Sequence, residues 1–495
     1  MKKIVYIALL IGFVSPQLFA QSNVDALRYS LTDPTGSTAR NMSLGGSMGA
    51  VGADPSAALS NPAALAQYRT SAFQFSLGML NIKNTADYLG NSSKSNRYSA
   101  EMPSINMVLT ERKMNRGAAA TSGWVNYNFG IGWNKTADFA RRISYSGMNN
   151  ENSYLDYVSN YVQGLPSSDL DANDEQLERG FYYFENMFWY AYLIDTVSDR
   201  NYMPTYNSAN PMMGQSGGIT TRGGMHELNL SFAANYEHKL YFGFGVDIHQ
   251  VNYKETNRFT EVDNPNTTGT WNSFDFTRNL NTSGIGYSGR LGLIFRPTNE
   301  FRLGLSLHSP TVLSLEDQYS DELYVVYDDG STEDMQTIDK EFKYNVVTPM
   351  KYALQGAYFF GKKGFISAEL ENLDYSTMGI WADNFEFDGE NSTIANKYTS
   401  ATNIKIGGEY AFNEFRLRAG YSQLGSPFSE GGNFNRKFAS LGFGLQENNW
   451  GFDIGVVKSL NEDQYVPYTT SGFAPQGVNS TVDGTRIVLS LVTKF

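Results

Sequence analysis

Apolar residues alternate with small or polar ones along most of the chain after residue 70. From Val125 to Asn134, every odd position is apolar and every even position is Asn or Gly. This period of two is the pattern of a β-strand whose two faces meet different surroundings. The same alternation recurs in 73–79, 240–248 and 301–307, and it continues to the C-terminus. The chain is therefore predicted to be all-β.

Fourteen segments of this kind can be counted, which is an even number, as expected of a bacterial single-chain barrel that spans the membrane. They cover 71–81, 97–111, 123–146, 225–236, 240–253, 283–296, 301–314, 343–360, 364–376, 400–412, 415–424, 436–446, 450–460 and 484–495. Tight turns alternate with long connections at 147–224, 254–282, 315–342 and 377–399. Because tight turns are typical of the periplasmic end and long loops of the outer end, both termini are predicted to be periplasmic.

A soluble β-sandwich with its apolar faces turned inward would show the same alternation. The N-terminus favours the membrane alternative, because residues 1–20 begin with Lys2 and Lys3, continue with an apolar run and end in Ala20. This is the pattern of a cleaved secretory signal peptide, and the run is shorter than the roughly 20 residues of a spanning helix. We therefore predict a 14-stranded antiparallel transmembrane β-barrel over residues 71–495, apolar toward lipid and polar toward the lumen.

Composition narrows the functional classes. The chain has 38 Lys and Arg against 50 Asp and Glu, a net charge of -12, which argues against nucleic acid as a partner. It has no cysteine, which excludes disulfides, thiolate zinc sites and iron–sulfur clusters. The four histidines are scattered, and no acid can be paired with His308 and Ser309 as a catalytic set. We expect no enzyme, no metal site and no cofactor.

Residues 21–70, between the signal peptide and the first strand, are rich in Gly and Ala. Asp54-Pro55 and Asn61-Pro62 each place a proline after a short polar residue, as at a helix N-terminus. The segment predicts a compact plug, with short helical turns at 55–59 and 62–67, that needs an enclosure. We call it the hatch segment, and its defining residues are Gly45, Gly46, Gly49, Asn61, Pro62 and Ala63.

The stretch GAVGADPSAALSNPAALA (49–66), the fourteen strands, and the phrases at 292–297 (GLIFRP), 348–349 and 364–367 (GFIS) resemble the FadL/TodX family. The resemblance implies an outer-membrane transporter of long-chain fatty acids or aromatic hydrocarbons in a Gram-negative bacterium. It also implies that an N-terminal hatch plugs the barrel, and that substrate passes from an external groove to a lumenal site and leaves sideways through a kinked strand. The long loop 147–224, the largest, departs from this pattern.

Several charged residues are predicted by alternation to face the lumen. The arginines among them are Arg142, Arg290, Arg302, Arg416 and Arg418. Most should pair with acids or with the hatch segment, because an isolated charge away from water is costly. An arginine left unpaired would suit the carboxylate of a fatty acid, which its planar fork matches.

The outer loop contains a dense aromatic run, FYYFENMFWYAYL, at Phe181–Leu193. Exposed apolar patches of this density usually mark a binding surface, which would make Phe181, Phe188, Trp189 and Tyr192 external capture residues. The alternative is that the run forms the loop's own small core.

The third strand loses its alternation after Trp133, where Lys135 falls on a position that should face lipid. A lysine costs about 2–4 kcal/mol at the bilayer midplane and much less near an interface. Either Lys135 lies at the outer rim, or the strand leaves the wall and opens a sideways path to the membrane. Gly130 and Gly132 would ease such a bend. We take Gly130, Gly132, Asn134 and Lys135 as candidates for a lateral exit.

The function predicted from the sequence is passive uptake of hydrophobic small molecules through an outer-membrane channel. The alternative is a barrel that acts as a surface receptor or adhesin through its long loops. The expected partners are the hydrophobic substrate, outer-membrane lipid, lipopolysaccharide and the barrel-assembly machinery, which the aromatic C-terminus Phe495 would address. We expect a monomer.

Overall fold

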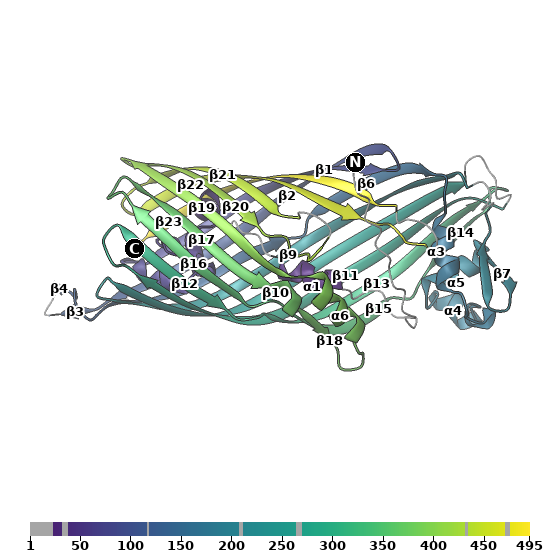
Figure 1. Cartoon of the computed structure of the whole chain (residues 1–495), viewed down its shortest axis with the longest axis horizontal. Helices are drawn as coiled ribbons and strands as arrows, with labels where there is room; N and C mark the ends of the chain where they lie inside the picture. The colour runs from purple at the N-terminus through teal and green to yellow at the C-terminus, as the bar shows by residue number, and fades with distance from the viewer. Residues whose placement is uncertain are drawn as a thin grey trace.

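The computed structural model describes residues 23–31, 38–115, 118–206, 211–263, 270–430, 434–470 and 476–495. It shows one elongated β-barrel with short helices inside it and at one end (Figure 1). The predicted signal peptide, residues 1–20, lies outside the described residues.

The wall consists of fourteen antiparallel strands, and pairing between the first and the last closes it. In order around the wall they are β1 (Ala72–Tyr88), β2 (Asn91–Arg112), β5 (Trp124–Asp138) with β6 (Arg141–Asn149), β9 (Met213–Tyr236), β10 (Leu240–Asp263), β11 (Trp271–Phe295), β12 (Phe301–His308) with β13 (Val312–Tyr327), β15 (Lys340–Val347) with β16 (Lys351–Phe359), β17 (Gly364–Asp374), β19 (Ser400–Phe412), β20 (Phe415–Leu424), β21 (Arg436–Gln446), β22 (Trp450–Tyr465) and β23 (Val478–Lys494). Three wall strands are interrupted and so consist of two parts each. The predicted fold class is confirmed.

The remaining strands are short and lie at the two ends of the barrel or beside it. They are β3 (Met114–Asn115), β4 (Ala118–Ala119), β7 (Ile194–Ser198), β8 (Asn201–Pro204), β14 (Thr332–Gln336) and β18 (Gly379–Trp381). The C-terminus lies at the end with the tight turns (Figure 1).

Several predicted loops are wrong, because the wall continues through them. The connection 82–96 is a hairpin in which β1 and β2 stay paired up to Tyr88 and Asn91. Most of 254–282 belongs to β10 and β11, and much of 315–342 belongs to β13. The largest loop is also shorter than 147–224, because β6 runs to Asn149 and β9 starts at Met213.

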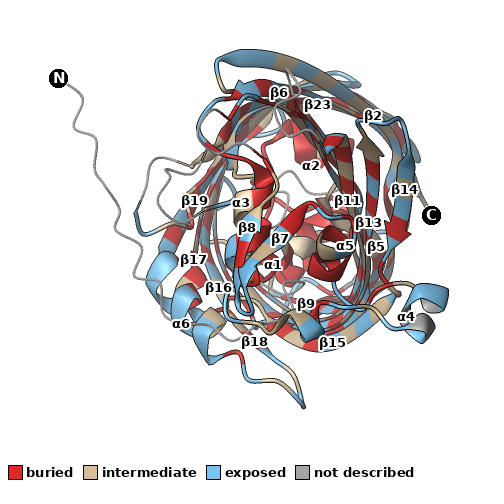
Figure 2. Cartoon of the chain, turned by 90° about the vertical axis from the view of Figure 1, so that its right-hand side faces the viewer, coloured by how far each residue is buried: buried red, intermediate tan, exposed pale blue. Residues whose placement is uncertain are grey.

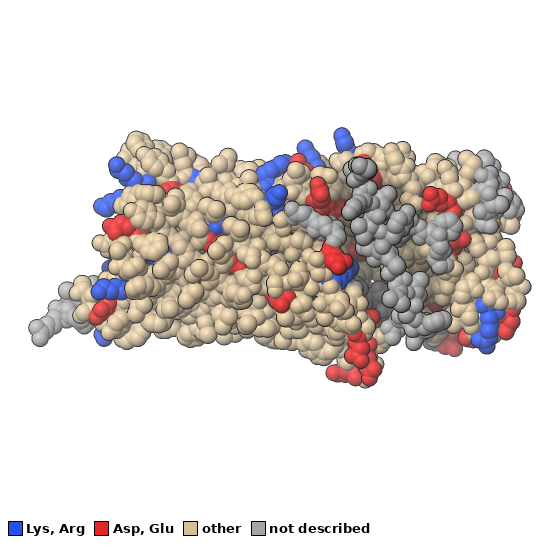
Figure 3. Space-filling view, viewed as in Figure 1, with Lys and Arg blue, Asp and Glu red and all other residues tan. Residues whose placement is uncertain are grey.

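The reason for these errors is an inversion of polarity along the wall, which β10 shows clearly. Near the tight turns, Phe242 and Val246 face outward and are about half exposed, while Asp247 is buried inside. Farther along, Tyr253 is buried inside and Lys254 is exposed. The part near the tight turns has the pattern of a wall that faces lipid, and Figure 3 shows few charged side chains there; we call it the membrane-type part. The part farther along has the pattern of a soluble barrel, and we call it the soluble-type end.

The soluble-type end of the barrel encloses an apolar core. A cap formed by residues 150–206 packs into it through α3 (Tyr154–Tyr161) and α5 (Phe184–Tyr190), and it also contains η3 (Ser167–Asp169) and α4 (Asp174–Arg179). The Phe188 ring lies 5.2 Å from that of Phe276 and 5.7 Å from that of Phe274, both on β11. Figure 2, which looks at this end, shows α3 and α5 of the cap within the ring of wall strands and α4 outside it.

The hatch segment lies inside the membrane-type part of the barrel. It contains α2 (Ala39–Ser43), η1 (Pro55–Leu59) and η2 (Pro62–Gln67), and the two 3₁₀ helices have the bounds predicted from their prolines. The Asp54 carboxylate accepts from the Ser56 amide at 2.9 Å, and the Asn61 side chain accepts from the Ala63 amide at 3.0 Å. These are the N-caps that the sequence indicated.

Three further helices complete the structure: α1 (Asn23–Ser30), the first helix of the hatch segment, inside the barrel, then η4 (Tyr375–Thr377) at the start of the predicted loop 377–399, and α6 (Asp388–Lys397) within that loop. Leu27 and Tyr29 of α1 pack against Val251 and Leu313 in the apolar part of the lumen. Among the described residues, no helix is both long and apolar enough to cross a membrane.

The inversion predicts a sharp dependence of stability on position along one face of β10. Val246→Lys should reduce the free energy of unfolding in lipid vesicles by about 2–4 kcal/mol, because the ammonium would face hydrocarbon. Asn252→Lys, on the same face but past the inversion, is the control and should change it by less than about 1 kcal/mol. Equal losses in denaturant titrations of the two variants would contradict a lipid boundary between these positions.

Candidate functional site

Polar side chains of the wall hold the hatch segment by its backbone and its caps. The Asn61 amide donates to the Gln355 side chain on β16 at 2.7 Å. The Arg302 guanidinium on β12 donates to the Val51 carbonyl at 2.6 Å and also contacts Gln67. On the opposite side, the Asn126 amide of β5 donates to the carbonyls of Ala66 and Tyr68, both at 3.1 Å.

A buried ion network fastens the start of the hatch segment to three wall strands. Arg40 of α2 lies 3.1 Å from a carboxylate oxygen of Glu409 on β19. Arg418 on β20 bridges Glu409 and Asp453, at 2.7 Å from each. Each positive group thus faces a carboxylate, which reduces the cost of burying it.

The wall carries glycines where the hatch segment touches it. A Cβ at Gly243 of β10 would lie 2.3 Å from the Ala63 amide nitrogen, and one at Gly292 of β11 would lie 2.0 Å from the Asn61 side-chain oxygen. On the hatch side, Gly45 has φ +63°, and its Cβ would lie 2.9 Å from the Tyr421 carbonyl. The wall and the hatch segment therefore approach each other at these contacts too closely for a side chain on the glycine.

A chamber of about 120 Å³ lies between α1 and the later part of the hatch segment. Its apolar lining includes Tyr29, Leu313 and Tyr375. Its charged and polar lining includes Glu227, His249, Arg290, His308, Lys351 and Lys405. A chamber with one apolar side and one charged side suits an amphipathic molecule better than a fully polar solute.

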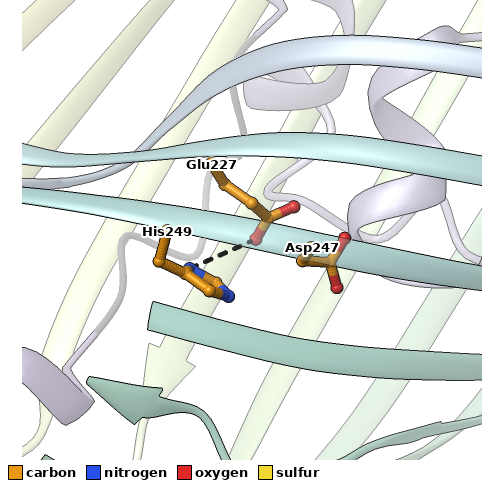
Figure 4. A group of neighbouring side chains, drawn as sticks. All are labelled: Glu227, Asp247 and His249. Atoms are coloured by element: carbon orange, nitrogen blue, oxygen red, sulfur yellow. Dashed lines mark ion pairs between the residues drawn. The ribbon is translucent and has the colours of Figure 1, made fainter. Parts of the chain in front are cut away.

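Glu227, Asp247 and His249 place three metal-type ligand atoms within 4.8 Å of one another (Figure 4). Arg290, however, lies 2.8 Å from Asp247 and also pairs with Glu227, so both carboxylates already share one guanidinium. It further donates to the Ala58 carbonyl of the hatch segment at 3.2 Å. The cluster is thus an arginine site that supports the hatch segment, and it fits a metal poorly.

The cation of the chamber that has no close partner is a lysine, which the sequence analysis did not single out. Within the described residues, Lys351 at the start of β16 forms no hydrogen bond and no ion pair within 4 Å, although its charge interacts with the Glu371 carboxylate across the chamber. By contrast, Lys405 lies 2.8 Å from Glu369 and 3.5 Å from Glu371. The alternation of Lys351, Ala353 and Gln355 with bulky outward residues places Lys351 inside, and it could have indicated this position.

The five predicted arginines have different surroundings. Arg290 and Arg418 lie in the lumen and are paired with carboxylates, and Arg302 binds the hatch segment. Arg416 donates to the carbonyls of Asn413 and Phe415 in its own turn, at the end of the barrel. The inward placement of Arg142 is wrong, because the interruption between β5 and β6 changes the alternation and leaves Arg142 exposed on the outer face.

The wall is interrupted between β2 and β5, at the strand proposed for lateral exit. These strands pair from Arg112 with Asn126 as far as Ser104 with Asn134. Beyond Asn134, β5 has a bulge between Lys135 and Ala137 in its pairing with β9, and no ladder joins β2 to β6 in the described residues. We call this interruption the seam.

Four charged side chains fill the inner side of the seam. Lys135 lies 3.1 Å from Glu101 on β2 and also pairs with Asp138. Arg486 on β23 lies 3.0 Å from the other oxygen of Glu101. Lys135 and Arg486 have side chains that are 12% exposed, so Lys135 neither faces lipid nor snorkels to the rim. The bulge turns it toward the acids.

The two glycines of β5 have another role than easing a bend. The strand is paired on both sides at Gly130 and Gly132, so the break occurs after them. A Cβ at Gly130 would lie 2.6 Å from the Leu65 side chain of the hatch segment, and one at Gly132 would lie 2.1 Å from Asn106. These glycines leave room for the contents of the lumen. Asn134 is buried at the start of the seam.

The four predicted capture residues in the aromatic run of the cap differ in how far they are buried. Phe181 and Phe188 are buried in the cap core and cannot belong to an outer surface. The Trp189 indole donates to Asp171 at 2.8 Å, whereas Tyr192 is 75% exposed. The Glu185 carboxyl, which lies on α5 together with Phe188 and Trp189, is also buried, and this burial raises its pKa. Most of the run is therefore a small core with tyrosines on its surface.

The sequence model of the family described as Outer membrane protein transport protein (OMPP1/FadL/TodX) matches residues 196–448, just over half of the chain. The chain belongs to this family. Members of the FadL/TodX family are outer-membrane transport proteins, so the chain is a transport protein and not an enzyme. No curated protein matches it in sequence.

Solved structures of other members share its fold. The crystal structure of the Pseudomonas putida toluene transporter TodX covers 94% of this chain and 99% of its own, with 14% identity and a TM-score of 0.52. A Pseudomonas aeruginosa FadL homologue gives the same four values. A deltaS2 mutant of the TodX monoaromatic hydrocarbon channel covers 92% and 98%, with 14% identity and a TM-score of 0.53. At this identity the likeness concerns the fold alone.

The close packing of the hatch segment on Gly243 predicts a leak when that contact is lost. Gly243→Ala would force the hatch backbone away from β10, so the folded barrel should pass small sugars in a liposome-swelling assay while the wild type does not. A deletion of 22–66 sets the upper limit of the leak.

Gly356→Ala is the matched control, because the added methyl group would meet nothing within 4 Å. If folded Gly243→Ala protein is as tight as this control, the hatch segment does not seal the lumen at β10.

Proposed function

We propose that the protein is a channel for passive uptake of hydrophobic small molecules, and that its lumenal site takes an amphiphile with an acidic head group. The observation that carries this proposal is the ammonium of Lys351, which has no hydrogen bond or close ion pair among the described residues and has only Glu371 as an acidic neighbour beyond ion-pair distance, in a chamber with an apolar outer side. TodX is described as a toluene transporter, and its substrate is uncharged. The free lysine favours a carboxylate, such as that of a long-chain fatty acid, over a hydrocarbon.

The inner face of β10 supports a continuous path through the barrel. Phe259 lies in the cap core, Tyr253 beside α1, His249 in the chamber, and Gly243 against the hatch segment. The surroundings of the lumen thus change from apolar to charged in the direction of the tight turns. An amphiphile that enters tail or head first from the outer end would stop where its head meets Lys351.

The hatch segment closes the lumen toward the periplasm in this proposal. It meets wall strands on opposite sides of the lumen through Gln355, Arg302, Asn126 and the Arg40 network. Such multiple polar attachments favour a fixed plug, so the substrate needs another way out.

The seam supports a lateral exit. Backbone pairing is missing between β2 and β6, and ion pairs among Glu101, Lys135, Asp138 and Arg486 take its place. Side-chain contacts of this kind can separate without unpairing a sheet. Lys135 also lines the chamber, which joins the lumenal site to the seam.

Capture at the outer surface would involve the exposed tyrosines of the cap, and the same tyrosines favour the alternative of a surface receptor or adhesin. Tyr182, Tyr183, Tyr190 and Tyr192 are all more than 40% exposed. Tyrosines at such positions supply contact area with little loss of side-chain entropy. A purified barrel that carries a lipid-like ligand supports transport, whereas an empty barrel with a protein bound to its cap supports the alternative.

Replacement of Lys351 tests the substrate class. Lys351→Met should weaken binding of a long-chain fatty acid about tenfold, because one charge-assisted hydrogen bond is lost. It should leave binding of the corresponding methyl ester unchanged. Fluorescence displacement in detergent can measure both affinities.

Lys343→Met serves as control, because Lys343 is exposed on β15 and lies 3.4 Å from Glu316, away from the chamber lining. Equal binding of acid and ester by the wild type would exclude an acidic head group at this site.

A disulfide across the seam tests lateral exit. The Ser95 hydroxyl on β2 donates to the Arg142 carbonyl on β6 at 2.7 Å, so the two strands lie close together there. Ser95 and Ile143, the residue after Arg142, both face the lumen, so we place the two cysteines at these positions. The wild type has no cysteine, so the bridge would be unique. The oxidised variant should stop uptake into vesicles, and reduction should restore it.

The matched control carries cysteines at Met107 and Ile131, which are cross-strand partners where β2 and β5 are paired, outside the seam. A disulfide there should leave uptake unchanged. Normal uptake by the oxidised Ser95 and Ile143 variant would place the exit elsewhere.

A further inference from the structure

Basic side chains form a belt on the outer face of the wall, near the seam. Arg222 on β9 stands directly opposite Lys254 on β10, and both are exposed. Arg142 on β6 stands opposite Thr220, two residues from Arg222 on the same face. We call Arg142, Arg222 and Lys254 the basic belt. Figure 3 shows Lys and Arg side chains along the adjoining upper edge, where Figure 1 has β1 and β2.

The belt continues across the seam. Lys94 on β2 is the neighbour of Ser95, which contacts Arg142, and it is exposed. Lys83 on β1 is exposed and stands opposite Asn96, two residues from Lys94. Five cations from five neighbouring strands thus share one surface.

These cations form no close ion pair among the described residues; Asp483 on β23, which stands directly opposite Lys83, is paired with Lys458. None of the five forms an ion pair there, although Arg258, four residues beyond Lys254 on β10, pairs with Asp275. Like charges directly opposite each other destabilise a sheet. The arrangement of Arg222 and Lys254 therefore indicates an external anion.

The belt lies just beyond the lipid-facing part of the wall. Met79 is 52% exposed and is the last large apolar residue on the outer face of β1 before Lys83. Four residues of a tilted strand correspond to roughly 10 Å along the barrel axis, which is the depth of lipid head groups. On β10, Val246 and Ile248 precede Lys254 in the same way.

We propose that the basic belt binds the phosphate groups of a phosphorylated glycolipid of the outer leaflet. Phosphate oxygens match the guanidinium fork, and basic side chains at a membrane surface attract anionic lipid with about 1 kcal/mol each. The lipid would neutralise the belt on both sides of the seam and cover the outer side of the interruption. This proposal does not rest on the substrate or on the route of transport.

The test uses the full-length barrel in uncharged detergent, with lipid A that carries two phosphates and the same lipid without phosphates. The wild type should bind the phosphorylated form more tightly. The triple variant Arg142→Gln, Arg222→Gln, Lys254→Gln should bind it about a hundredfold more weakly. Affinity for the phosphate-free lipid should not change, and the remaining phosphate-dependent binding should fall with added salt.

The matched control is Arg258→Gln, Asp275→Asn, which removes an ion pair from the same outer face without changing the net charge. It should bind like the wild type. Thermal unfolding without lipid checks that the triple variant is folded, and the loss of like-charge contacts should not lower its stability. Failure of the wild type to prefer the phosphorylated lipid, or full binding by the triple variant, would overturn the proposal. Equal competition by inorganic phosphate would overturn the assignment to a lipid.

Discussion

Closed backbone pairing is the constraint on which this structure depends. In hydrocarbon an unpaired amide or carbonyl costs several kcal/mol, so a wall that faces lipid must pair every strand with two neighbours. The pairing of β1 with β23 meets this requirement by joining the two ends of the sheet. The seam is the place where pairing stops, and there Lys135 and Glu101 supply polar contacts that the backbone does not. The proposed lateral exit therefore coincides with a break in the backbone pairing of the wall.

Closure also determines what the lumen can contain. Because apolar side chains face lipid, the inward positions of the membrane-type part are polar and many are charged, and each charge needs a partner. The hatch segment supplies some of these partners with its backbone, as in the contact between Arg302 and the Val51 carbonyl. The hatch segment and the charged side chains of the lumen therefore stabilise each other. Lys351 stands out because it has no close ion pair among the described residues, which is the physical basis for a ligand with an acidic head.

Beyond the membrane the requirement changes, and so does the sequence pattern. The wall continues as a barrel in water, where apolar side chains turn inward and pack on the cap through residues such as Phe188 and Phe274. The cap encloses the outer end without a single spanning helix. The basic belt marks the border between the two parts, where cations can meet lipid head groups while the strands stay paired.

The alternation of the sequence by itself determined the all-β class, the fourteen strands and the lipid-facing side, because a period of two directly reports two different environments. The caps of η1 and η2 could likewise be predicted, since Asp54 and Asn61 act on amides two residues away. The lengths of the outer loops could not be predicted, because the strands continue beyond the membrane with the opposite alternation. There an outward polar residue no longer distinguishes a loop from a strand. Pairing between distant residues was decided by the tertiary structure alone: Lys135 meets Glu101 only through a bulge, and Arg142 faces outward only because β5 ends early. Whether a lumenal cation has a carboxylate within ion-pair distance depends on all of its neighbours in space. The position of Lys351 without a close ion pair could therefore be recognised only in the folded barrel.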